Sequence, residues 1–92
     1  MLSDFSTPSI VYNQAKHYFG SDVEIKPSTR SGKKYMLLNP HTNKWIYFGA
    51  FGYEDYTKHH NEKRREAFRK RNHKWAKQDK YTPGWLSYYL LW

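Results

Sequence analysis

The chain contains no cysteine and no long hydrophobic run, and these two absences exclude several classes of protein. Without cysteine, disulfide bonds and thiolate metal sites cannot form. No apolar run approaches ~18 residues and no secretory h-region is present, so we expect neither a membrane span nor export by a signal peptide. A length of 92 residues allows one domain, residues 1–92, with a small core.

Recognisable catalytic and metal-binding motifs are also missing. The five histidines show no HxxxH spacing, and the chain has no Gly-rich phosphate loop and no Ser/His/Asp arrangement. Glu24–Lys26 has the E-x-K letters of one class of metal-dependent nucleases, but the upstream acidic partner is absent. His59–Asn61 shares letters with HNH nucleases without the separations that their metal fold needs. We therefore predict a protein that is not an enzyme and uses no metal or cofactor.

Positive charge and aromatic rings are the abundant features. Sixteen Lys and Arg outweigh eight Asp and Glu, and 20% of the residues are aromatic. Large rings let a short chain bury much area per residue, so we expect a folded protein rather than a disordered basic tail. The net charge of +8 favours a polyanionic partner, first nucleic acid and then an anionic membrane surface or an acidic protein.

Most of this charge lies between Lys58 and Lys77, which hold nine Lys and Arg against two Glu. The segment contains no Pro or Gly and is rich in helix-forming residues, so we predict one long basic helix over about 56–77. Five apolar or weakly polar positions fall on one arc roughly 120° wide: Tyr56, His60, Ala67, Phe68 and Trp75. The predicted helix is therefore amphipathic, with a packing side and a basic outer side.

Arg64 and Arg71 project into the apolar arc of this helix, seven residues apart. In one interpretation the aliphatic parts of the two side chains pack against the apolar arc, and their guanidinium groups reach water or an acid such as Glu54 or Asp55. In the other they border an anion-binding seam between the helix and a sheet. The sequence leaves both interpretations open.

Two shorter helices are predicted near the ends of the chain. Thr7-Pro8 supplies an N-cap and a proline at the first helical position, which begins a helix over 8–19. The same arrangement at Thr82-Pro83 begins a short C-terminal helix over about 83–92. Residues 1–7, before the first helix, are expected to be flexible.

Three strands are predicted between the helices. Val23–Lys26 alternates apolar and polar residues, and Lys33–Asn39 and Lys44–Gly49 are rich in strand formers with a short turn between them. The predicted fold is α+β: a small three-stranded antiparallel sheet with a β-hairpin. It is packed by an N-terminal helix, the long basic helix and the short C-terminal helix.

Nucleic-acid binding requires long cationic side chains on a rigid element, since phosphates supply most of the affinity. The basic helix offers seven such residues: Lys58, Lys63, Arg65, Arg69, Lys70, Lys74 and Lys77. Four more extend the patch if the hairpin lies alongside: Arg30, Lys33, Lys34 and Lys44. Four aromatic residues are candidates for stacking on bases: Tyr35, Trp45, Tyr47 and Tyr53. We expect binding directed at the backbone, to double-stranded DNA rather than RNA.

Several motifs carry a resemblance to a known family. They are Ser28–Arg30, Lys33–Tyr35, Ile46–Gly49, Gly52–His59, Glu62–Arg65 and Thr82–Trp92. With them the chain resembles, over roughly residues 22–92, a family of small basic proteins encoded by large nucleocytoplasmic DNA viruses. Thr82 replaces the family's usual Ser, and Asn61 a more usual acid. The resemblance implies a viral origin, a place in the virion or in the cytoplasm or nucleus of the infected cell, and no catalytic residue.

A structural role is the alternative to genome binding. A minor capsid or virion-core protein also needs a compact aromatic fold and a charged face, which would dock on acidic or apolar protein surfaces. Its closing segment GWLSYYLLW, residues 84–92, would then insert into another virion protein. The salt dependence of binding distinguishes the two roles. Affinity for phosphates falls steeply as the salt concentration rises, whereas the affinity of an apolar interface hardly changes.

Overall fold

The computed structural model describes residues 1–92 and confirms the predicted α+β class, with a three-stranded antiparallel sheet. The helices and strands follow the chain in this order: α1 (Pro8–Phe19), β1 (Ile25–Pro27), β2 (Lys33–Asn39), β3 (Lys44–Ala50), α2 (Tyr56–His59), α3 (Glu62–Arg71) and α4 (Pro83–Leu86). Two 3-10 turns, η1 (Leu2–Asp4) and η2 (His73–Lys77), and a π-helical turn, η3 (Ser87–Leu91), complete it. None of the helices combines the length and apolar character that crossing a bilayer requires.

The sheet has the order β1-β2-β3, so β2 is its central strand. The predicted hairpin is confirmed, with Tyr35 opposite Phe48 and β3 one residue longer than predicted. Asn43 takes a positive φ of 57° in the turn, a conformation that asparagine tolerates better than most residues. The first strand begins at Ile25 rather than at Val23, and its three residues pair with β2.

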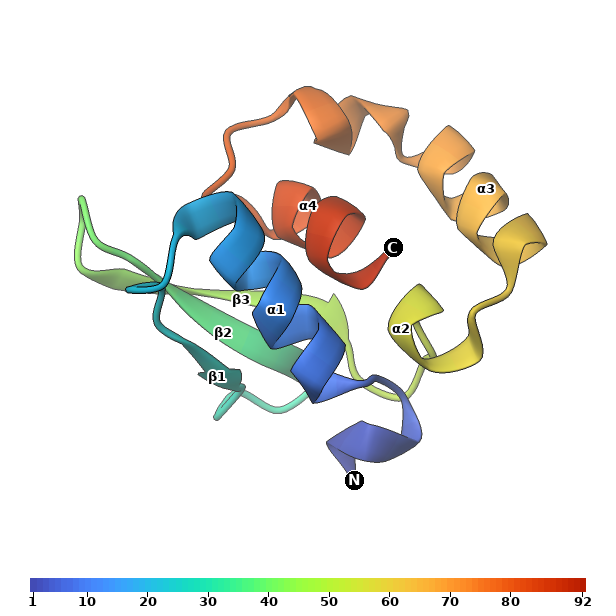
Figure 1. The fold of residues 1–92 in the computed structure, drawn as a ribbon, viewed down its shortest axis with the longest axis horizontal. Coiled ribbons are helices and arrows are strands. Elements are labelled where there is room, and N and C mark those ends of the chain that lie inside the picture. Colours follow the sequence, from blue (N-terminus) through green and yellow to red (C-terminus); the bar gives the residue numbers. More distant parts are fainter.

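The core lies between one face of this sheet and the helices α1 and α4–η3 (Figure 1). Its members come from both ends of the chain: Val11, Ala15, Tyr35, Leu37, Phe48, Leu86, Leu90 and Leu91. Tyr35 is 0% exposed, so its predicted use for stacking on bases is wrong. The three core leucines of α4–η3 also mean that GWLSYYLLW docks on its own sheet instead of presenting those side chains to another protein.

Residues 1–7 are not the flexible segment that we predicted. Ser6 is only 1% exposed, and the amide of Thr7 donates to Thr57 Oγ1 at 2.9 Å. The carbonyl oxygen of Phe5 accepts a hydrogen bond of 3.0 Å from the amide of Asp55. These polar groups are buried and need partners, so the segment before α1 is fixed to the loop that enters α2.

The single helix predicted over 56–77 is also wrong, because the structure divides it into α2, α3 and η2. α2 ends where His60 adopts the left-handed conformation, with φ 52°. Asn61 then caps α3: its Oδ1 accepts a hydrogen bond of 3.1 Å from the amide of Arg64. A cap of this kind satisfies one of the amides that the first turn of a helix leaves without an intrahelical partner.

The predicted helix starts at the two ends of the chain are confirmed. α1 covers the predicted residues 8–19, and α4 with η3 covers most of 83–92. Thr82 caps α4 by accepting from the amide of Trp85 at 3.3 Å. Thr7 does not cap α1 with its side chain, because its hydroxyl donates to the carbonyl oxygen of Thr57.

Candidate nucleic-acid interface and the cavity beneath it

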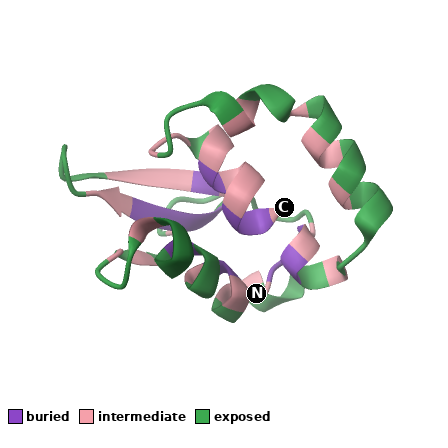
Figure 2. Ribbon diagram, turned by 45° about the horizontal axis from the view of Figure 1, so that its top comes forward, coloured by how far each residue is buried: buried purple, intermediate pink, exposed green.

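The segment α3–η2 forms an arch over the end of α4–η3 (Figure 1), and most of the arch is exposed (Figure 2). No residue of α3 is fully buried. The arch is held at its middle, where the Phe68 and Trp92 rings stack with centroids 4.4 Å apart and an interplanar angle of 6°. α3 therefore stays at a distance from the sheet, with one side facing solvent and the other lining the space below it.

Arg65 and Arg69 help to hold this arch in place. Arg65 Nε donates to the main-chain oxygen of Trp92 at 2.7 Å, and Arg69 Nη2 donates to the same oxygen at 3.1 Å. Both side chains are half-buried rather than exposed, so their predicted role as free phosphate contacts needs correction. Their first role is to anchor α3 to the end of η3.

The remaining predicted cations of the arch are exposed. Lys63, Lys70, Lys74 and Lys77 form no ion pair. Lys63 and Lys70 are seven residues apart on α3, and Lys74 and Lys77 are three apart on η2, so each pair lies on one side of its own helix. Lys58, on α2, is also exposed, and its amine donates to the Ser3 carbonyl oxygen at 2.9 Å.

The hairpin contributes less to this patch than predicted. The turn between β2 and β3 lies at the opposite end of the molecule from α3 (Figures 1 and 2), so Lys44 does not extend the patch. Arg30 and Lys33 are exposed in the β1–β2 loop and at the start of β2. The Arg30 guanidinium lies 4.1 Å from the centre of the Tyr47 ring, which it partly covers.

Lys34 is wrongly assigned to nucleic-acid binding. It is 3% exposed, and its Nζ lies 3.0 Å from Oδ2 of the fully buried Asp55. The same amine donates to the Phe5 carbonyl oxygen at 3.3 Å. Burial lowers the pKa of the Lys34 amine, and the Asp55 carboxylate opposes that shift. This lysine therefore joins the strand, the N-terminal segment and the α2 loop inside the fold.

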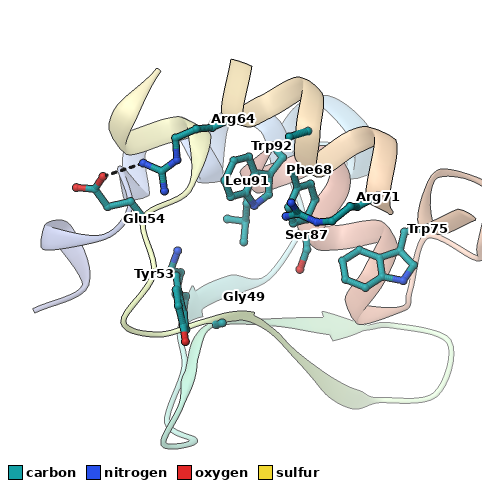
Figure 3. A pocket seen from close by; sticks show the side chains of 13 residues that line it. Gly49, Tyr53, Glu54, Arg64, Phe68, Arg71, Trp75, Ser87, Leu91 and Trp92 are labelled. Atoms are coloured by element: carbon teal, nitrogen blue, oxygen red, sulfur yellow. Dashed lines mark ion pairs between the residues drawn. The ribbon is translucent and has the colours of Figure 1, made fainter. Parts of the chain in front are cut away.

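A cavity of about 420 Å³ lies between the arch and the end of β3 (Figure 3). Gly49 and Ala50 of β3 form its floor, and Phe68 with Trp92 closes part of its roof. Tyr53 stands on one side of the cavity and is 73% exposed. Trp75 stands on the other side, so aromatic rings face the cavity from two separate elements.

Arg64 and Arg71 both line this cavity, so both stand at the seam between helix and sheet that the second interpretation described. Arg64 Nη1 lies 3.6 Å from Glu54 Oε1, and both side chains are about half-exposed. This pair matches the first interpretation of Arg64, whose head reaches an acid. Arg71 forms no ion pair and no hydrogen bond, so its charge is free to act at the cavity.

His59, on α2, lies beside Trp92, with ring centres 5.2 Å apart. Its Nδ1 accepts a hydrogen bond of 2.9 Å from the amide of Asn61. Burial and the nearby Arg64 charge lower the pKa of this imidazole. No group of three or more His, Asp or Glu side chains lies close enough together to hold a metal ion.

Sequence reasoning found part of the cavity and missed the rest. The apolar arc predicted on the basic helix contains Ala67, Phe68 and Trp75, which do line it. Tyr53 is one of the four aromatic residues that the sequence offers for base stacking, and no local pattern connects it to Trp75. The loop that carries Tyr53 had to be placed opposite the arch before the two rings could face one space.

Comparison with known proteins gives the family. Residues 23–72 match a family of unknown function, DUF5754. The match covers 50 of the 92 residues and extends from just before β1 to the end of α3. The chain belongs to this family. No curated protein and no solved structure matches the chain.

Proposed function

We propose that this protein binds nucleic acid without catalysing a reaction, by contacting phosphates through the exposed face of α3–η2. The observation that supports the proposal is the row of four unpaired lysines: Lys63, Lys70, Lys74 and Lys77. Glu62 and Glu66 are the only acidic residues of α3–η2.

The chemistry of such a row favours affinity without base recognition. Each lysine that neutralises a phosphate releases condensed counterions, which makes binding strongly dependent on salt. Contacts to the backbone carry no sequence information by themselves. Cations fixed along α3 and η2 suit the regular phosphate backbone of duplex DNA, which is the polymer we expect. The resemblance to proteins of large DNA viruses favours DNA as well, and a virion or an infected cell as the setting.

The test compares two variants that lose the same charge. In the first, Lys63, Lys70 and Lys74 are replaced by Gln; in the control, the exposed Lys16, Lys44 and Lys80 are replaced by Gln. Binding to labelled duplex DNA is measured at salt concentrations between about 50 and 200 mM. We expect the first variant to bind weakly at every concentration and the control to resemble the unaltered protein.

The salt dependence makes the test quantitative. The slope of log affinity against log salt should fall by roughly 2–3 in the arch variant, because each lost phosphate contact removes about 0.9 from it. Equal losses in both variants would indicate attraction to total charge rather than to the arch. Absence of binding by the unaltered protein at low salt would refute the proposal.

Docking on a virion protein is the second candidate. The exposed lysine row also suits an acidic protein surface, whereas the buried leucines of α4–η3 do not suit an apolar anchor. If the unaltered protein binds neither DNA nor RNA at low salt, docking on an acidic virion protein becomes the leading proposal. The lysine row would then be the contact surface.

A further inference from the structure

The cavity beneath α3 has the size and composition of a small-molecule site. Its volume of about 420 Å³ lies in the range of ~300–1,000 Å³ typical of ligand pockets. Such pockets combine apolar and aromatic walls with a few polar groups that fix the ligand. Here the walls are the rings of Tyr53, Trp75 and the Phe68–Trp92 stack, and the polar groups include Arg64 and Arg71.

Arg71 is the group that points to an anionic ligand. It lines the cavity without an ion pair or a hydrogen bond. Trp75 of η2 lines the same space, so the cavity offers both a cation and a flat ring (Figure 3). A guanidinium binds a phosphate through two parallel hydrogen bonds, and it does so better than an ammonium group.

Arg64 adds a second cation that a ligand can recruit. Its partner Glu54 is 3.6 Å away, and both side chains are about half-exposed, so water weakens their attraction. A second phosphate, which a nucleotide within a strand has next to it, could take the place of Glu54 without the cost of breaking a buried pair. The two arginines are two helical turns apart, which leaves room between them for a flat ring.

We propose that this cavity binds one nucleotide unit, with its base between the rings of Tyr53 and Trp75 and its phosphate at Arg71. The ligand class is a nucleoside monophosphate, either free or as an unpaired nucleotide within a single strand. Every base has a face that stacks on aromatic side chains, so the site tolerates different bases. This inference rests on the proposed nucleic-acid binding and adds a second mode to it, distinct from the lysine row.

A base that is paired within a duplex cannot enter the cavity. A base reaches a pocket only when it is unstacked and unpaired, and an unpaired strand has already lost that pairing energy. The cavity component of binding therefore favours single strands over duplexes. The lysine row contacts phosphates of either form.

The experiment titrates the protein with adenosine monophosphate, adenosine and inorganic phosphate, and with a single-stranded and a duplex oligonucleotide. Dissociation constants come from calorimetry, and the indole N–H signals of Trp75 and Trp92 in NMR spectra report the site. We expect adenosine monophosphate to bind more tightly than adenosine or phosphate, and to shift the Trp75 signal.

Two variants test the assigned residues. Arg71→Gln removes the phosphate contact, and Tyr53→Ala removes a stacking ring from an exposed loop position, where loss of folding is not expected. Each should weaken adenosine monophosphate binding by at least about fivefold, the lower end of what one stacked base or one hydrogen bond to a charged group contributes. Lys16→Gln and Phe51→Ala are the matched controls for charge and for an exposed ring, and should bind as the unaltered protein does.

The outcomes separate the two proposals. Duplex binding without binding of adenosine monophosphate or a shift of the Trp75 signal would overturn the cavity assignment and leave the lysine row standing. Binding of the nucleotide without duplex binding would support the cavity and refute the lysine row. Nucleotide binding that both Arg71→Gln and Tyr53→Ala leave unchanged would also overturn the assignment.

Discussion

Replacing Asp55 by Asn should destabilise the fold strongly, because it leaves the Lys34 amine buried without a counter-ion. Asp55 is 0% exposed, and its Oδ2 lies 3.0 Å from Lys34 Nζ. Asparagine has nearly the same shape and keeps the oxygen that accepts from the Thr57 hydroxyl. The substitution therefore removes the charge and places an amide NH2, which only donates, where Oδ2 accepted from the Lys34 amine.

The magnitude follows from the burial of both groups. At an effective dielectric constant of ~20, two unit charges at this distance attract by roughly 5 kcal/mol. Removing one partner of a buried pair typically costs about 3–5 kcal/mol, since the other charge stays desolvated. Small domains are stable by only ~5–15 kcal/mol, so we expect Asp55→Asn to lose a large part of the free energy of unfolding.

Urea unfolding followed by circular dichroism measures this loss. Glu54→Gln is the matched control, because it removes the neighbouring acid from the half-exposed pair with Arg64 and should cost less than about 1 kcal/mol. A double variant, Lys34→Met with Asp55→Leu, should recover much of the stability, since it leaves no buried charge. Equal costs for Asp55→Asn and Glu54→Gln would refute the reasoning.

Three further predictions concern single positions. Gly49→Ala should cost about 1–3 kcal/mol, because φ is +81° and the added Cβ would lie 2.9 Å from Leu91 Cδ1; unfolding at an unchanged urea midpoint would contradict this. Asn61→Ala should cost about 1 kcal/mol and lower the helical signal, because the amide of Arg64 loses its cap; an unaltered spectrum and midpoint would argue against it. The free energy of unfolding should fall as pH drops below about 6.5, because the pKa of His59 is lowered in the fold and the unfolded chain binds the proton more readily. His59→Gln should lose that part of the slope in urea titrations between about pH 7 and 5, and an identical slope would show that other groups cause it.

The elements that the sequence predicted well depend on neighbours along the chain. The turn between β2 and β3 needs a residue that tolerates a positive φ, and Asn43 meets that need locally. The helices α1 and α4 begin at the prolines of Thr7-Pro8 and Thr82-Pro83, where the fixed φ and the missing amide suit a first turn. No distant contact is required for these features.

The break in the basic helix was harder to predict, since residues 56–77 contain no Pro or Gly. Asn61 is a good N-cap residue, but its signal competes with the helix-forming residues on both sides. α2 is fixed by the hydrogen bonds of Thr57 to the segment before α1, and α3 is fixed by the stacking of Phe68 on Trp92. The left-handed turn at His60 lets both contacts form.

By itself the sequence determined the α+β class, the hairpin, the helix starts and the concentration of positive charge in one segment. Only the tertiary structure decided which of those charges are free. It placed Lys34 against Asp55, twenty-one residues further along, and Arg65 against Trp92, twenty-seven residues further along. It also left Arg71 at the cavity. Local propensity fixes backbone conformation over a few residues, whereas burial and pairing of a charge depend on segments that only folding brings together.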